Sequence, residues 1–410
     1  MRAAGLIACL AAASCAGAST RAADFLIRNA TVHTITSAAP LEHTDVRIHG
    51  KVIVAVGKDL AAAGATVLEA GNRPLTPGLW GGLSTLGLID LPGEADTADA
   101  SQGAGAPPWH QQWRPEFDVT LAYNPRATVV PITRIEGVTW AVLEPASDDS
   151  ILGGQGAAVT LSGDYDAVLA GSRSLFLQLG GGSNKLSNGS RAGGYMLLDQ
   201  AVREARAPAA AGEMALLHPA GREALLRYLD HGRIVFDVQR AADILQLIAF
   251  AQRMGIKAVV SGGSEAWVVA KQLSRANIPV ILDPLQNLPS GFDQLASRLD
   301  NAALLHRAGV TIAFSGGYAR GIRQPAGNAV AAGLPWEVAL ASITRTPAEI
   351  FGLGSIRGRI AVGQAADLVL WDGDPLEVTT IAERVWIAGE PVTMRSRQTL
   401  LRDRYLSRSH

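Results

Sequence analysis

Cysteine is nearly absent from this sequence. Two of the 410 residues are cysteine, and both, Cys9 and Cys15, lie within the first 23 positions. Residues 1–23 have the pattern of a secretory signal, with a positive start at Arg2, an apolar run and an alanine-rich end. Cleavage of this segment would leave a chain without a disulfide, a thiol nucleophile or a thiolate metal ligand. We therefore expect an exported protein of the bacterial periplasm.

Long apolar runs are also missing. The apolar part of the predicted signal is shorter than the about 20 residues that a membrane-spanning helix needs, so no transmembrane segment is predicted. The residues Ala12-Ala13-Ser14-Cys15 loosely resemble a bacterial lipoprotein signal, in which leucine is usual where Ala12 stands. Lipid anchoring through Cys15 is therefore the alternative to a cleaved, unanchored chain.

Neither sign of charge is in excess, and histidine is scarce. The sequence has 36 basic and 37 acidic residues and a formal net charge of -1. This balance gives no reason to expect nucleic acid or an anionic membrane as a partner. The eight histidines form no cluster along the chain, so a metal centre built from several histidines is not expected.

Both ends of the remaining chain alternate apolar and polar residues with the period of two that is typical of strands. The pattern covers residues 24–75 near the N-terminus, with a turn at Gly50-Lys51, and residues 356–395 near the C-terminus. These segments predict short antiparallel strands joined by turns.

The segment between these ends has the length of a TIM barrel, about 250 residues. Its second half alternates strand and helix patterns, which predicts a parallel sheet with right-handed crossovers. We expect strands at 233–236, 258–260, 279–282 and 310–314, and helices at 222–229, 241–254, 265–276, 292–308, 328–332, 336–343 and 347–351. The first half predicts long loops, at 98–108 and 180–184.

Two stretches resemble the amidohydrolase superfamily. Leu75–Gly87 contains Pro-Gly-Leu and a later Leu-Gly, as does the first barrel strand of the family, where Ile-Asp-x-His-x-His stands between them. Gly363–Leu376 reproduces almost letter for letter the late family motif Gly-x-x-Ala-Asp-Leu-Val-x-Trp-Asp-Gly-Asp-Pro-Leu. The sequence is therefore similar to exported, imidazolonepropionase-like amidohydrolases.

The resemblance implies an α/β fold: a TIM-type (β/α)8 barrel with a small β-sandwich domain built from both chain ends. The implied organisation is a signal peptide at 1–23, a composite β-sandwich from 24–75 and 356–395, a barrel at 76–355 and a C-terminal tail at 396–410. The late motif identifies the scaffold and not the chemistry, because function depends on the site and not on the fold.

The resemblance also implies where metal ligands should stand. The family holds one or two zinc or other divalent ions with two histidines on strand one, a histidine on each of strands five and six, and an aspartate after strand eight. Such an ion lowers the pKa of bound water toward about 7 and so supplies hydroxide. The corresponding positions in this sequence are degenerate: Leu83, Thr85, Asp237, Gly262 and Gly316. We therefore expect no metal and no other cofactor.

Other groups near the expected barrel mouth are candidates for a rebuilt site. Asp237 is the candidate catalytic residue. Gly262 and Gly263 precede a predicted helix and could present backbone N–H groups to an anionic ligand, with Arg240 or Arg323 assisting. The alternative for both glycines is a tight turn without a ligand. The histidines His218, His231, His306 and His110 are expected in surface or packing roles.

Two classes of function follow. The first is a metal-free pseudoenzyme that binds a small-molecule ligand or forms a homo-oligomer, or a hetero-oligomer with an active amidohydrolase. The second is a working hydrolase of carbon–nitrogen bonds, in non-peptide or cyclic amides, with a non-standard site. Leucine cannot donate electrons to a metal, and this favours the first class.

Overall fold

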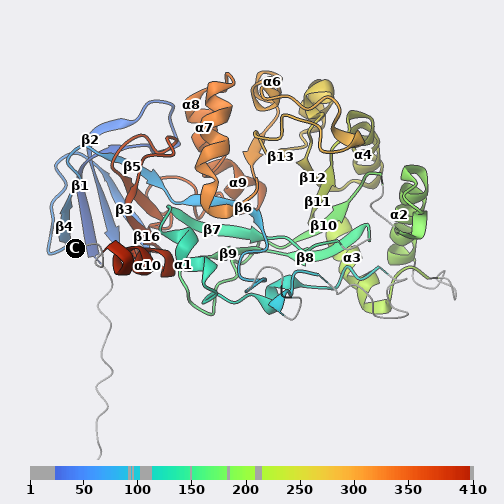
Figure 1. The fold of residues 1–410 in the computed structure, drawn as a ribbon, viewed down its shortest axis with the longest axis horizontal. Helices are drawn as coiled ribbons and strands as arrows, with labels where there is room; N and C mark the ends of the chain where they lie inside the picture. Colours follow the sequence, from blue (N-terminus) through green and yellow to red (C-terminus); the bar gives the residue numbers. More distant parts are fainter. Residues whose placement is uncertain are drawn as a thin grey trace, which may run out of the picture.

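A computed structural model describes residues 24–90, 94, 97–101, 113–147, 150–181, 185–207 and 215–406. The predicted signal at 1–23, with Cys9 and Cys15, and the loop residue His110 lie outside these residues. Within the described ranges, no helix has both the length and the apolar character needed to cross a membrane. The chain is a mixed α/β protein built on three sheets (Figure 1).

The largest sheet has eight strands and combines both chain ends. Its strands follow the order β17-β16-β15-β5-β1-β2-β3, and β4 pairs with β1. The strands are β1 (Asp24–Val32), β2 (Leu41–His49), β3 (Val52–Gly57), β4 (Thr66–Glu69), β5 (Pro74–Pro77), β15 (Leu368–Trp371), β16 (Ala382–Ile387) and β17 (Glu390–Pro391). The predicted association of the two end segments is confirmed by the pairing of β5 with β15.

The first strand, β1, is continuous across the polar pair Arg28-Asn29. The pairing with β2 shifts between Ile27 and Ala30, so the strand has a bulge at this pair. Asn29 has φ of 56°, a conformation that asparagine tolerates better than most residues. The strand therefore continues through the polar residues.

The other two sheets come from the middle of the chain. One has six strands in the order β14-β13-β12-β11-β10-β8, and the other three in the order β6-β7-β9. The strands β10 to β14 are parallel, as are β6 and β7, whereas β8 and β9 are antiparallel to their neighbours. Their bounds are β6 (Leu79–Ser84), β7 (Val138–Leu143), β8 (Leu152–Gly156), β9 (Ala158–Thr160), β10 (Ser174–Gln178), β11 (Arg233–Val238), β12 (Lys257–Gly262), β13 (Val280–Leu282) and β14 (Ile312–Phe314).

One hydrogen bond joins β6 to the residue after β14, and another continues the pairing of β7 with β9 to the residue that joins β8 to β9. The Leu83 amide of β6 donates to Ser315 Oγ, just past β14, at 2.9 Å. The Leu143 amide of β7 donates to the carbonyl of Ala157, which joins β8 to β9, at 2.9 Å. One buried cluster takes a side chain from every strand of these sheets except β8: Trp80, Trp140, Ala158, Phe176, Val235, Val259, Ile281 and Ala313.

Helices follow most of the parallel strands. They are α1 (Val129–Arg134), α2 (Arg191–Arg206), α3 (Pro219–Asp230), α4 (Ala241–Met254), α5 (Ala270–Ala276), α6 (Asn301–Arg307), α7 (Arg323–Ala331), α8 (Trp336–Ala341), α9 (Arg345–Ile350) and α10 (Arg397–Leu406). Figure 1 shows α4 and α6 above strands of the six-stranded sheet, α7 and α8 above β6 and β7, and α10 beside α1.

The sequence predicts α4 at its observed bounds, because its apolar stripe ends at Gly255. This glycine has φ of 69° and closes the helix in the left-handed conformation. The long helix expected at 292–308 is instead broken: a single 3-10 turn at Phe292–Gln294 precedes the short α6. Phe292 is 90% exposed, so this part of the segment has no apolar face buried against the sheet.

Candidate functional site

The ends of four strands meet around one cavity. Thr85 follows β6, Glu144 follows β7, Gln178 ends β10, and Asp237 lies near the end of β11. With Ser147 these residues line a cavity of about 420 Å³, which we call the carboxylate pocket. The carboxyl ends of parallel strands are where α/β proteins place their ligands.

Two carboxyl groups dominate the electrostatics of the carboxylate pocket. Burial, and to a lesser degree the negative charge of Asp237, raise the pKa of Glu144 to about 8. Burial also raises the pKa of Asp237, against the effect of a hydrogen bond from Gln239. Among the described residues that line this cavity none is basic. The pocket is therefore acidic, and near neutral pH its Glu144 carboxyl holds a proton.

Gln239 fixes the position of Asp237. Its amide Nε2 donates to Asp237 Oδ1 at 2.7 Å, and its Oε1 accepts from the backbone amide and hydroxyl of Ser264 at 3.3 Å and 2.8 Å. A Cβ atom at Gly262 would lie 2.0 Å from the same Nε2. Glycine is therefore required at 262 so that the Gln239 side chain can lie across the loop.

The position of the Gln239 side chain affects the anion site that was expected at Gly262 and Gly263. The Gly263 amide donates to the Val238 carbonyl at 2.8 Å, and Gln239 occupies the space above Gly262. Arg240, directly before α4, is exposed. The structure thus brings Asp237, Gly262 and Gly263 together through Gln239, but shows the tight turn that was the alternative interpretation.

Arg323 lies elsewhere in the fold. It begins α7, is buried, and donates to the Glu377 carbonyl at 2.8 Å. Its guanidinium lies 4.9 Å from the ring centre of Trp371, and Glu136 is 3.8 Å away. These contacts join α7 to the C-terminal part of the eight-stranded sheet. The structure does not bring Arg323 to the carboxylate pocket.

The positions expected to hold metal ligands carry other roles. The Leu83 amide bonds Ser315, and a Cβ atom at Gly316 would lie 2.7 Å from the carboxylate of Asp283, whose pKa burial raises. No group of three or more His, Cys, Asp or Glu side chains in the described part of the chain is placed to hold a metal ion. Two carboxyl groups and the Gln178 amide do not fit the histidine-rich donor set of the family.

The remaining described histidines that sequence analysis singled out lie outside the pocket. His218 and His231 flank α3 at its two ends, and His306 lies in α6. None of them lines the carboxylate pocket.

Glu144 and Gln178 were not among the residues expected at the site, because the sequence before residue 233 gave no clear strand pattern there. The pairing of β10 with β11 puts Gln178 opposite Asp237. A usable signal was present at Glu144: it directly follows Val138–Leu143, six residues that are all buried, and a charge ending such a run marks a strand terminus.

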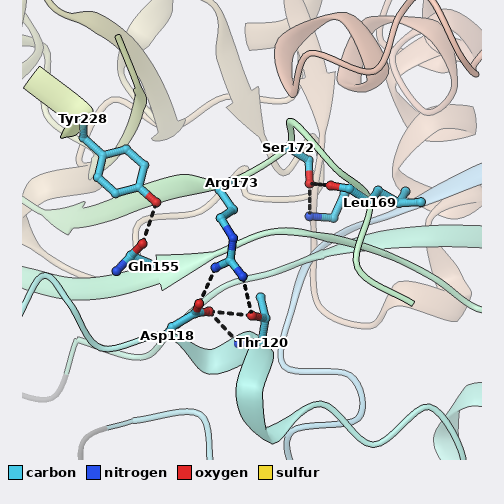
Figure 2. A network of polar contacts seen from close by, with 8 residues as sticks. Asp118, Thr120, Gln155, Leu169, Ser172, Arg173 and Tyr228 are labelled. Atoms are coloured by element: carbon cyan, nitrogen blue, oxygen red, sulfur yellow. Dashed lines mark hydrogen bonds and ion pairs between the residues drawn. The ribbon is translucent and has the colours of Figure 1, made fainter. Parts of the chain in front are cut away.

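A second polar network lies where β10 begins, at the opposite end from the carboxylate pocket (Figure 2). Arg173 forms an ion pair with Asp118 and donates to Thr120 Oγ1 at 3.3 Å. Asp118 also accepts from the Thr120 amide at 3.0 Å and so caps a 3-10 turn. Tyr228 donates to Gln155 at 2.9 Å. These side chains satisfy one another, which indicates a structural role.

Comparisons with known proteins agree with this architecture. A model described as the amidohydrolase family matches residues 322–393. The crystal structure of an amidohydrolase from Thermotoga maritima MSB8 superposes with a TM-score of 0.79 at 24% identity, covering 90% of this chain and 100% of that chain. A zinc-bound adenosine deaminase from Xanthomonas campestris gives a TM-score of 0.51 at 18% identity, covering 95% and 98%.

A curated relative, amidohydrolase tasK from Hapsidospora irregularis, is 49% identical over 57 residues. The match covers 14% of this chain and 6% of that relative, so it concerns a short segment of a much longer protein. The family model and the curated relative thus match limited segments of the chain, and the solved structures share its fold.

Proposed function

We propose that the six-stranded and three-stranded sheets are parts of one TIM-type (β/α)8 barrel, and that the eight-stranded sheet is the β-sandwich domain of residues 24–75 and 356–395. Two bonds support the barrel: Leu83 to Ser315 at one junction and Leu143 to Ala157 at the other. The shared cluster that contains Trp80 and Trp140 supports it as well, because inward side chains of successive strands fill a barrel core.

We further propose that this chain is a metal-free member of the superfamily that binds a small molecule in the carboxylate pocket. One observation carries the proposal: Glu144 and Asp237 share a cavity in which their pKa values are raised, while Leu83 and Gly262 stand at ligand positions. A cavity of about 420 Å³ is within the range of small-molecule sites, roughly 300–1,000 Å³.

The chemistry of the pocket selects a ligand that donates hydrogen bonds and carries positive charge. Asp237 accepts hydrogen bonds, and Glu144 becomes a second acceptor once a bound cation displaces its proton. A protonated amine meets both requirements. An anionic ligand would find no basic partner among the described lining residues.

Thermal denaturation with n-butylammonium and with the neutral isostere 1-butanol tests this function. We expect a larger rise in Tm with the ammonium ion, because binding to the folded state alone stabilises it by mass action. Asp237→Asn should abolish the difference, and Glu390→Gln, on an exposed carboxylate of β17, should preserve it. Equal shifts with the amine and the alcohol in the unaltered protein would sink the proposal.

A second candidate is hydrolysis of carbon–nitrogen bonds in cyclic or non-peptide amides without a metal. A pKa of about 8 at Glu144 favours it, because general acid–base groups work best when their pKa is near the working pH. Hydrolysis of a cyclic imide that continues in the presence of a chelator would support catalysis over simple binding. Its rate should change with pH near 8, and this pH dependence should be lost in Glu144→Gln.

For location and partners we propose cleavage after about residue 23, release into the periplasm, and association with a metal-bearing homologue or with further copies of this chain. Lipid anchoring through Cys15 is the alternative. Mass spectrometry of the mature N-terminus distinguishes cleavage after about residue 23 from cleavage before a lipidated Cys15. Co-purification from periplasmic extract identifies the partner. Retention of residues 1–23 in the mature protein would contradict the export proposal.

A further inference from the structure

A second, larger cavity adjoins the carboxylate pocket. Its volume is about 760 Å³, and Thr85 lines both cavities. We call it the apolar chamber, after the side chains that surround it: Leu86, Ile89, Val129, Ile132, Tyr318 and Ala319. They come from the segment after β6, from α1 and from the segment after β14. The two cavities therefore meet at the end of β6, at one of the degenerate ligand positions.

Several polar groups in the wall of the apolar chamber are already engaged. Ser84 Oγ accepts from a backbone amide at 3.1 Å, and Thr133 Oγ1 donates to a carbonyl of its own helix at 2.8 Å. Arg320 donates to Gln398 at 3.2 Å, and Glu94 adds an exposed carboxylate to the lining. A ligand in this chamber thus meets the apolar side chains named above, together with the charged groups of Arg320 and Glu94.

The C-terminal helix α10 completes the outer wall. It contributes Gln398 to the lining and contacts α1, and Figure 1 shows the two helices side by side. Large apolar side chains further along this helix are exposed; Leu400 is 55% and Leu406 is 61% exposed. The helix is therefore held to the body of the protein at its start, where it borders the chamber.

We propose that the apolar chamber receives the uncharged alkyl or aromatic part of the ligand whose polar end lies in the carboxylate pocket. The ligand class is then an amphipathic amine. The inference rests on the proposed function of the carboxylate pocket and adds the apolar half of the ligand. The physical basis is the removal of apolar surface from water, which favours a hydrocarbon group in an apolar cavity of this size.

A series of n-alkylammonium ions from ethyl to hexyl, titrated into the full-length mature protein by calorimetry, tests the inference. Each added CH₂ should tighten binding about fourfold until the chamber is filled. The corresponding n-alcohols report the apolar contribution without the charged head.

Two variants of the chamber and one control assign the location. Ile132→Asp places a charge in the wall, and Tyr318→Ser removes a lining side chain that is 80% exposed and so is not needed for folding. Both should reduce the dependence of affinity on chain length. Val362→Ser, at an apolar residue that is 67% exposed and lines neither cavity, should leave it unchanged.

The outcomes separate this inference from the proposed function. Affinity that is independent of chain length, or a dependence that persists in both chamber variants, overturns the apolar chamber as a ligand site. Amines that bind no better than alcohols, with a chain-length dependence that the chamber variants abolish, contradict the carboxylate pocket as the head site and leave the chamber as a site for apolar molecules.

Discussion

At the scale of single residues, Glu144 is the group with the most consequential environment. Its carboxyl group is buried beside Asp237, and its pKa of about 8 means that ionisation is costly in the folded state. In the unfolded chain the same group titrates near its ordinary value. Between these two pH values the folded state holds a proton that the unfolded state has lost.

This difference predicts a specific pH dependence of stability. The contribution of Glu144 is full below the unfolded pKa and is lost as pH rises through about 8, so the folded state weakens on the alkaline side. Glu144→Gln should remove this loss. The difference in unfolding free energy between the variant and the unaltered protein should therefore be more favourable to the variant at pH 9 than at pH 5, by about a few kcal/mol.

Urea denaturation of both proteins at the two pH values measures the effect, with Glu390→Gln as the control for removing an exposed glutamate. If the stability curves of Glu144→Gln and the unaltered protein run parallel from pH 5 to pH 9, the interpretation of Glu144 is incorrect.

Gly262 provides a second test at this scale. A methyl group there would collide with the Gln239 amide, and φ of 85° disfavours any side chain. Gly262→Ala should therefore cost more than the about 1 kcal/mol expected for a left-handed alanine without a clash. The matched control is Gly255→Ala, where φ is 69° and no atom lies within 4 Å.

Chemical denaturation of the two alanine variants gives the comparison, and the double variant Gln239→Ala with Gly262→Ala should recover part of the loss. Equal costs at Gly262 and Gly255 would show that Gln239 does not occupy the loop in the way described.

At the scale of secondary-structure elements, the motif at Gly363–Leu376 forms side-chain contacts that join strands of the eight-stranded sheet; we call these contacts the clamp. Asp367 accepts from Arg357 at 2.9 Å and from the Ala388 amide at 2.7 Å, and both members of the ion pair are buried. Trp371 donates to Thr76 at 2.9 Å, which joins β15 to β5. Asp367 and Trp371 of the motif therefore hold neighbouring elements of the scaffold together.

Asp367→Ala should therefore be strongly destabilising. It leaves the buried Arg357 charge without its partner, a change that typically costs about 3–5 kcal/mol. Asp403→Ala breaks the exposed pair with Arg402 in α10 and should cost less than about 1 kcal/mol. Thermal unfolding of the two variants makes the comparison, and a loss of similar size in both would refute the clamp.

Some of the strands could be predicted from the sequence and others could not. Strands with a helical partner after them, such as β11 with α4, were predictable because two periodicities and a terminal glycine agreed. The strands β8 and β9 were not, since β8 is the glycine-rich run Leu152–Gly156. A Cβ atom at Gly156 would lie 1.9 Å from the Leu143 carbonyl. Because the strands approach so closely, glycine is required there, and the segment lacks the run of apolar residues from which a strand would be predicted.

At the scale of the whole molecule, the resemblance to amidohydrolases rests on sequence motifs, whereas the candidate site does not. The expected ligand positions at Leu83 and Gly262 follow from the resemblance. The carboxylate pocket could not be predicted, because Glu144 and Asp237 are 93 residues apart, follow or end strands of two different sheets, and meet only in the folded chain. Long-range contact, and not local pattern, creates the acidic cavity.

In the described part of the chain no group of three or more His, Cys, Asp or Glu side chains is placed to hold a metal ion, and near neutral pH Glu144 holds a proton beside Asp237. A divalent ion between Glu144 and Asp237 would lower both pKa values and remove the buried-carboxyl effect described above. Binding of a metal and the proposed binding of an organic cation are therefore alternatives for the same space. The metal content of the protein distinguishes the two.

The metal content of the purified mature chain, measured by inductively coupled plasma mass spectrometry after growth with added zinc, decides this most directly. We predict far less than one zinc or other divalent transition metal per chain, and the same low content in Asp237→Asn. One metal ion per chain that is lost in Asp237→Asn would contradict this prediction and would return the carboxylate pocket to the metal-dependent chemistry of the superfamily.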